Sequence, residues 1–150
     1  MALAQDIAVL ESVPLFRQLD RDALRLIAFA AEARSGQPGE LLFIRGEVSD
    51  AGYVVMSGSV VVEGAAGDRI IASRGTLIGE MALLIDTERP VTATVKEAGQ
   101  LLKISRGVFR RVLEEYPEAA DALRDLIARR MEDTLLDLGR VGDSLMAIKD

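Results

Sequence analysis

The segment Gly79-Glu80-Met81-Ala82 combines a glycine, a carboxylate and consecutive backbone amides at the start of a short apolar helical turn. Glycine lets a ligand approach the backbone closely because it has no Cβ atom. The first amides of a helix have no intrahelical partner and carry the positive end of its dipole. These amides suit an anion, and the Glu80 carboxylate suits sugar hydroxyls as an acceptor. The spacing therefore predicts a cradle for a phosphate attached to a sugar.

The cation nearest to this cradle in the sequence is Arg89, which is followed by Pro90, Val91 and the alternating segment 92–95. On a continuous strand, Arg89 and Val91 would point to the same face, with Cα atoms about 7 Å apart. Pro90 restricts the geometry between them. The sequence leaves open whether the Arg89 guanidinium reaches the cradle.

Composition narrows the classes of function. The 150 residues contain no cysteine and no histidine, so thiol chemistry, the commonest general base and the commonest metal ligand are all missing. We therefore expect a protein that is not an enzyme and that has no metal site and no cofactor. The net charge of −6 argues against a nonspecific nucleic-acid binder, so no nucleic-acid partner is expected.

Length and hydropathy predict one domain over residues 1–150 in a cytoplasmic protein. No apolar run approaches the roughly 18 residues that span a bilayer, so no membrane partner is expected. The N-terminus contains Asp6 and lacks a basic start, which excludes a typical signal peptide. A chain without cysteine fits a reducing compartment.

The spacing of apolar residues around the cradle changes twice along the chain, from helical to strand-like and back to helical. Helical spacing is expected over residues 3–12 and from an Asp20 N-cap to about Ala31, and it returns after a Ser105 N-cap. A break is expected at Tyr116-Pro117, followed by one long helix to about Leu138. Between these helices, short strands with glycine turns favour a sandwich or barrel. The expected strands are 41–44, 53–56, 59–63, 69–73, 92–95 and 100–104.

Three segments together resemble the cyclic nucleotide-binding domain of catabolite activator proteins, protein kinase regulatory subunits and cyclic nucleotide-gated channels. The first segment is residues 39–60, which contains Gly39-Glu40, Arg45-Gly46-Glu47 and Ser57-Gly58-Ser59-Val60. The second is Ile78-Gly79-Glu80-Met81-Ala82-Leu83-Leu84, and the third is Thr92-Ala93-Thr94-Val95. The resemblance covers roughly residues 13–138. It implies an α+β fold whose strands form an antiparallel double-stranded β-helix. This jelly-roll-like β-roll would span residues 32–105, approximately. An N-terminal helix and two C-terminal helices at about 106–140 would flank this roll.

The resemblance implies a regulatory module that binds cyclic AMP or cyclic GMP. By position, it implies a ligand site at Ile78, Gly79, Glu80, Met81, Ala82, Arg89, Val91, Thr92 and Ala93. Glu80 would accept from the ribose 2′-hydroxyl, and the Ala82 amide would meet the phosphate. Alternatively, the Glu80 carboxylate only caps or pairs within the fold. Thr92 stands where relatives that accept guanine often carry threonine, although threonine also suits any strand.

One departure from the family pattern supports a second hypothesis. Val91 occupies the position at which the family places its phosphate-binding arginine, and Arg89 lies two residues earlier. A charged hydrogen bond contributes about 1.5–3 kcal/mol, and a loss of about 3 kcal/mol weakens binding by more than a hundredfold. The alternative is a degenerate member of the family that serves as an interaction or dimerisation module without tight nucleotide binding.

The long C-terminal helix would serve in the family as a lid and a dimer contact. Its residues Ile127, Met131, Thr134 and Leu138 have heptad-like spacing, which suits a homodimer or packing on the chain's own β-roll. Arg129 and Arg130 would be solvated or stack on a base. Because the chain ends near where the family's transcription factors begin their DNA-binding domain, we expect it to act through its own dimer or an unknown effector protein.

Overall fold

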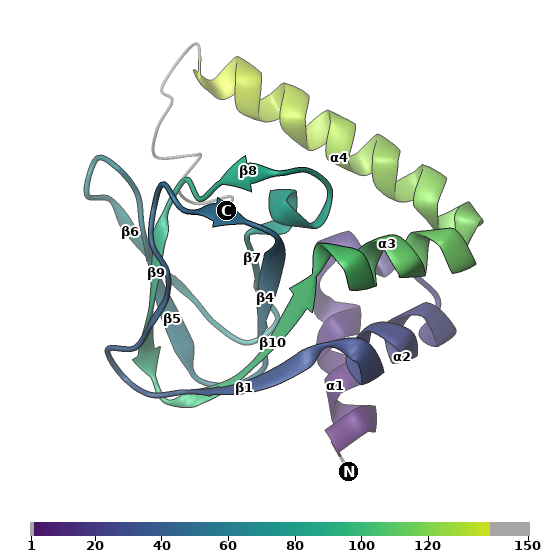
Figure 1. Ribbon diagram of the computed structural model, residues 1–150, viewed down its shortest axis with the longest axis horizontal. Helices are drawn as coiled ribbons and strands as arrows, with labels where there is room; N and C mark the ends of the chain where they lie inside the picture. The colour runs from purple at the N-terminus through teal and green to yellow at the C-terminus, as the bar shows by residue number, and fades with distance from the viewer. Residues whose placement is uncertain (1, 139–150) are drawn as a thin grey trace.

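The computed structural model describes residues 2–138, in which a β-roll lies beside a group of helices (Figure 1). Two α-helices and a 3₁₀ helix precede the roll: α1 (Ala2–Ser12), η1 (Pro14–Gln18) and α2 (Arg21–Ala30). Two further helices follow the roll: α3 (Arg106–Glu115) and α4 (Pro117–Leu138). The strands thus lie between two helical segments, residues 2–30 and 106–138, which form the helical side.

The β-roll is built from two four-stranded sheets and one two-stranded ribbon, and its strand pairs are antiparallel. The first sheet has the order β1 (Glu32–Gly36), β10 (Gly99–Ser105), β4 (Ala51–Val55) and β7 (Leu77–Ile78). The second has the order β2 (Leu41–Phe43), β9 (Thr92–Glu97), β5 (Ser59–Glu63) and β6 (Arg69–Ala72). The ribbon pairs β3 (Val48–Ser49) with β8 (Thr87–Glu88). This arrangement confirms the predicted antiparallel, jelly-roll-like fold class.

The helix boundaries follow local chemistry. The Asp20 side chain accepts from the Ala23 amide at 2.9 Å, and the Ser105 hydroxyl accepts from the Val108 amide at 3.1 Å. Each bond satisfies one of the amides that a helix start leaves unpaired. α3 ends before Tyr116, and Pro117 begins α4, as predicted from the proline.

Two buried clusters form the core. One joins α1, η1, α2 and α3 to the first sheet and includes Phe16 and Phe109, whose ring centroids lie 6.1 Å apart. The other fills the β-roll and includes Phe43, Tyr53 and Val91. The position that the family pattern assigns to the phosphate arginine is therefore part of the apolar interior.

The structure also contains elements that the sequence did not indicate. β1 has the polar sequence Glu-Ala-Arg-Ser-Gly, which lacks apolar alternation, and β3, β7 and β8 have only two residues each. The two N-terminal helices, by contrast, match the helical segments expected at residues 3–12 and from Asp20 to about Ala31, although the resemblance implied only one N-terminal helix. Pairing with neighbouring strands, which local sequence does not encode, defines these short strands.

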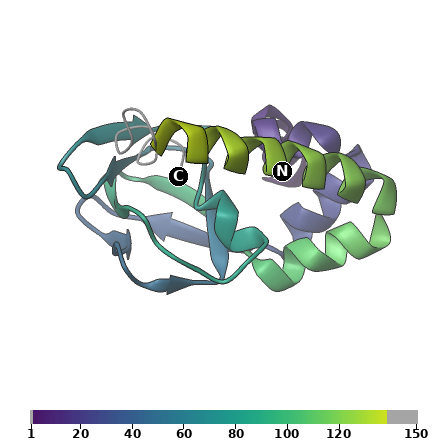
Figure 2. The same ribbon diagram turned by 90° about the horizontal axis from the view of Figure 1, so that it is seen from above.

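α4 contacts α3 and η1 and then extends beyond the helical group (Figures 1 and 2). The side chains of Ile127, Met131, Thr134 and Leu138 lie outside the residues whose side chains the structure describes, as does that of Arg130; Arg129 is exposed. Within residues 2–138, no helix has both the length and the apolar character needed to cross a membrane.

Candidate anion-binding site

The cradle begins where β7 ends. Ile78 pairs with Tyr53 of β4 and is buried, and Gly79 follows with φ +80°. This left-handed conformation favours glycine, and it turns the chain sharply into η2 (Glu80–Leu83). The expected helical turn is a four-residue 3₁₀ helix, so any dipole contribution is confined to one turn.

The cradle residues differ in their exposure. Glu80 and Met81 are half-buried, whereas Ala82 is buried, and its amide donates to the Gly79 carbonyl at 3.1 Å. On the facing strand β9, Ala93 is buried, and Thr92 is half-buried with its hydroxyl accepting from the Arg45 amide at 3.0 Å. Glu80, Met81 and Thr92 are therefore the partly accessible side chains among these residues.

Arg89 does not lie on a continuous strand with Val91, contrary to the geometry expected from the sequence. β8 ends at Glu88, Pro90 and Val91 form a bend, and β9 begins at Thr92. Proline restricts the backbone here and offers no amide for strand pairing. The guanidinium consequently turns back toward η2, while Val91 packs into the β-roll core.

The Arg89 guanidinium reaches the start of the cradle. Arg89 is only 6% exposed, and its Nη2 donates to the Ala51 carbonyl at 2.7 Å. Nη1 lies beside Gly79, because a Cβ atom added to that glycine would be 2.4 Å from it. Among the residues that the structure describes, this buried nitrogen has no hydrogen-bond partner. An unpaired buried donor of this kind is uncommon in folded proteins and calls for an explanation.

Burial dominates the electrostatics of Arg89. Desolvation lowers the pKa of its guanidinium, and the nearby Tyr53, Asp50 and Glu47 oppose that shift by raising it. Arginine nevertheless stays protonated at neutral pH because its guanidinium is a very strong base. The site thus contains a poorly hydrated cation, which interacts strongly with an anion because water screens it little.

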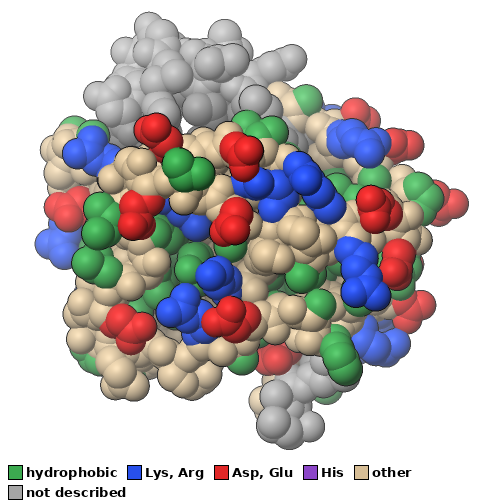
Figure 3. All heavy atoms as spheres, in the orientation of Figure 1, with side chains coloured by type: hydrophobic (Ala, Val, Ile, Leu, Met, Phe, Trp, Pro, Cys, Tyr) green, Lys and Arg blue, Asp and Glu red, His purple; other side chains and the backbone are tan. Residues whose placement is uncertain are grey.

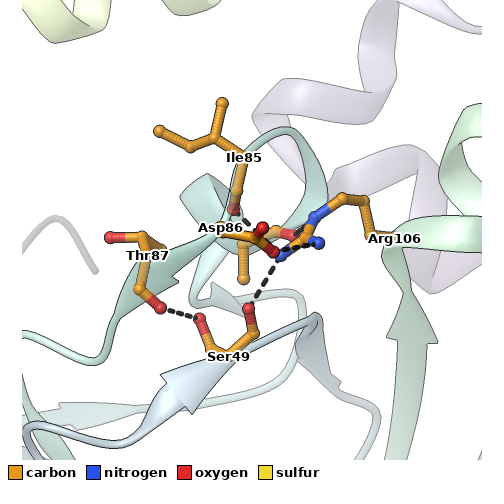
Figure 4. A network of polar contacts seen from close by, with 6 residues as sticks. Ser49, Ile85, Asp86, Thr87 and Arg106 are labelled. Atoms are coloured by element: carbon orange, nitrogen blue, oxygen red, sulfur yellow. Dashed lines mark hydrogen bonds and ion pairs between the residues drawn. The ribbon is translucent and has the colours of Figure 1, made fainter.

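A second arginine, Arg106, holds the cradle against the start of α3 (Figure 4). Its Nε donates to the Ala82 carbonyl at 2.8 Å, and its Nη2 donates to the Ser49 and Ile85 carbonyls at 2.7 and 3.0 Å. Its Nη1 pairs with Asp86 at 2.6 Å. The sequence did not indicate this role, because an arginine at a helix start resembles ordinary polar surface. Only the fold brings Ser49, η2 and α3 together.

The surface around these elements carries mixed charge. Figure 3 shows acidic and basic side chains interspersed over the visible face. Arg110 and Arg111 on α3 are exposed, and Arg111 pairs with Glu115 on the same helix. No group of acidic side chains suited to a metal ion occurs among the described residues.

Comparison with known proteins decides the family. The family model of the cyclic nucleotide-binding domain matches residues 33–116. The chain belongs to the cyclic nucleotide-binding domain family. The match runs from within β1 to the end of α3 and includes the Gly79 cradle, Arg89 and Arg106.

Regulatory proteins are among the relatives of this cyclic nucleotide-binding domain. It is 30% identical over 130 residues to the cyclic AMP receptor protein of Thermus thermophilus, covering 83% of the chain and 60% of that protein. A cyclic nucleotide-binding-like protein from Brucella abortus is 36% identical with a TM-score of 0.64, covering 73% of this chain and 97% of the other. The N-terminal domain of a Streptomyces coelicolor transcriptional regulator is 30% identical with a TM-score of 0.73, covering 84% and 94%.

The chain spans only part of its longer curated relatives. It covers 7% of a lysophospholipase, 11% of a cGMP-dependent protein kinase and 14% of a potassium channel. Sequences similar to this domain thus occur in proteins with different activities. The activity of each whole protein therefore does not transfer to this domain.

Proposed function

We propose that this domain is a non-catalytic sensor that binds cyclic AMP or cyclic GMP in the cradle, with Arg89 as the cation for the phosphate. The observation that carries the proposal is the buried Arg89 Nη1, which lies beside Gly79 without a hydrogen-bond partner among the described residues. The family pattern places the arginine at Val91, but the bend at Pro90 gives Arg89 a route to the same cradle.

The chemistry of a cyclic phosphate suits this arrangement. It is a monoanion, and hydrogen bonds from a charged guanidinium to phosphate are about twice as strong as neutral ones. Arg89 is already ordered by its bond to the Ala51 carbonyl, so little conformational entropy is lost when the anion binds. Half-buried Glu80 would accept from the ribose 2′-hydroxyl, as the family resemblance implies.

The ligand would regulate by shifting the helices. Arg106 bonds to η2 and its following loop while it begins α3, and α3 in turn contacts α4. A change in the cradle is therefore transmitted to the start of the C-terminal helices. Such a shift requires that the ligand bind the two helix arrangements with different affinity. A homodimer or a separate effector protein in the cytoplasm would detect it.

Isothermal titration calorimetry with cyclic AMP and cyclic GMP tests the proposal. We expect heat of binding for the unaltered protein and about a hundredfold weaker affinity for Arg89→Ala, equivalent to about 2.8 kcal/mol. Arg89→Lys should fall between them because it keeps the charge but loses the planar donors. Arg111→Ala, which removes an exposed arginine on α3, serves as the control.

Three results would count against the proposed role. No heat at millimolar concentrations of either nucleotide would favour the interaction or dimerisation module. Full affinity in Arg89→Ala would remove Arg89 from the phosphate site. Steady turnover of a cyclic nucleotide would contradict the non-catalytic assignment.

A further inference from the structure

The aromatic side chains around Arg89 carry a further inference, which rests on the proposed function. The Arg89 Cζ atom lies 4.0 Å from the centroid of the Phe43 ring and 5.9 Å from that of Tyr53. The two rings are themselves 5.9 Å apart, and both are almost completely buried. The guanidinium therefore lies over one aromatic face inside the β-roll and close to a second.

The local backbone fixes Phe43 in this position. Phe43 pairs with Ala93, whereas Leu41 pairs with Thr94, so the register of β2 shifts between these two residues. In a regular strand, Leu41 and Phe43 would share a face. The irregularity instead leaves Leu41 about half exposed and turns Phe43 into the core.

Backbone hydrogen bonds hold the Phe43 and Arg89 segments together. The Arg89 amide donates to the Glu47 carbonyl at 2.7 Å, and the Gly46 amide donates to the Arg89 carbonyl at 2.8 Å. The Arg45 amide also donates to the Thr92 hydroxyl at 3.0 Å. The ring and the guanidinium therefore come from two segments that hydrogen bonds tie together.

We infer that Phe43 is a positioning residue for the anion site, and that its ring holds the Arg89 guanidinium with Nη1 at Gly79. A ring face attracts a cation through its quadrupole, and this attraction increases when water is excluded. The Ala51 carbonyl binds the guanidinium through Nη2. The ring supports the face of the group, so Nη1 is left for the phosphate.

The test separates the electrostatic role of the ring from its packing role. Phe43 is replaced with 3,4,5-trifluorophenylalanine, which keeps the ring shape but weakens the negative charge of its face. Phe43→Leu removes the ring. The same two replacements at Phe16, a buried ring in the other core cluster, are the matched controls. Thermal melting confirms that each variant is folded.

Cyclic AMP affinity is the first measurement. We expect a loss of about tenfold for Phe43→Leu, equivalent to 1.4 kcal/mol, and a smaller loss for the fluorinated ring. The Phe16 replacements should leave the affinity unchanged. If the fluorinated Phe43 variant binds as tightly as the unaltered protein, Phe43 acts by packing alone and the inference is wrong, while the proposed function stands.

The NMR shift of the Arg89 side chain in the ligand-free protein is the second measurement. We expect a ring-current shift of the Arg89 Nε–Hε signal that disappears in Phe43→Leu. An Arg89 signal that is the same in both proteins would overturn the inference without reference to any ligand. Complete absence of cyclic nucleotide binding by the unaltered protein would instead refute the proposed function, and the inference with it.

Discussion

Replacement of Gly79 with alanine is expected to move the Arg89 guanidinium out of its place in the cradle. The new Cβ atom would lie 2.4 Å from Arg89 Nη1, whereas ordinary contacts begin at 3.4 Å, so one of the groups must move by about 1 Å. The φ angle of +80° adds backbone strain of about 1–2 kcal/mol for a residue with a Cβ. Overpacking of a tight site costs about a further 1–3 kcal/mol.

Gly67→Ala separates these two effects. Gly67 has φ +87°, and an added Cβ there meets no atom within 4 Å, so this variant has the backbone strain without the overlap. Urea unfolding of both variants should give a loss of free energy of unfolding that is larger for Gly79→Ala by about 1–3 kcal/mol. Cyclic nucleotide affinity should decrease by more than tenfold in Gly79→Ala and remain unchanged in Gly67→Ala.

A double-mutant cycle with Arg89→Ala tests whether the guanidinium is the group that the added Cβ atom of Gly79→Ala overlaps. Without the guanidinium, the excess cost of Gly79→Ala over Gly67→Ala should disappear, because the side chain that it overlaps is gone. An equal cost for the two glycine variants would show that Arg89 Nη1 does not lie beside Gly79. An excess that persists without Arg89 would show that another neighbour causes it.

Two further predictions concern the residues around the cradle. Arg106→Gln should lower the free energy of unfolding by about 3 kcal/mol, because it disrupts bonds from a largely buried guanidinium to three carbonyls. The control variant Arg111→Gln, on the exposed face of α3, should lower it by less than about 1 kcal/mol. Equal losses in urea unfolding would contradict the structural role of Arg106. Val91→Arg, which restores the family pattern, should destabilise the β-roll by several kcal/mol because Val91 is buried in the apolar core, and a thermal melt at or above that of the unaltered protein would refute this placement.

The sequence predicted those parts of the fold that are encoded by local chemistry. Asp20 and Ser105 cap helices because their side-chain oxygens accept from nearby amides. Pro117 begins a helix because its ring fixes φ at a helical value and the first helical position needs no amide donor. The longer strands, such as β5, have an apolar pattern of their own. β1 is a strand only because β10 pairs with it along its whole length. That pairing depends on residues about 65 positions away in the chain.

In the candidate site, too, some features follow from local sequence and others depend on contacts between distant segments. The family resemblance named the cradle, but no local rule could place the Arg89 guanidinium, because its position depends on the bend at Pro90 and on contacts with Phe43 and Ala51. Arg106 was missed for a similar reason, since its partners come from two segments, Ser49 and residues 82–86, that are far from it in the chain. Side chains that act across the fold resemble ordinary surface residues in the sequence.

A crystal structure of the domain with bound cyclic AMP or cyclic GMP tests the central claim most directly. The account predicts that the phosphate lies at Gly79 and that an oxygen of the phosphate accepts a hydrogen bond of about 2.7–2.9 Å from Arg89 Nη1. It also predicts that Nη2 stays on the Ala51 carbonyl. A bound nucleotide whose phosphate does not contact Arg89 would contradict the claim that this arginine replaces the one that the family pattern places at Val91.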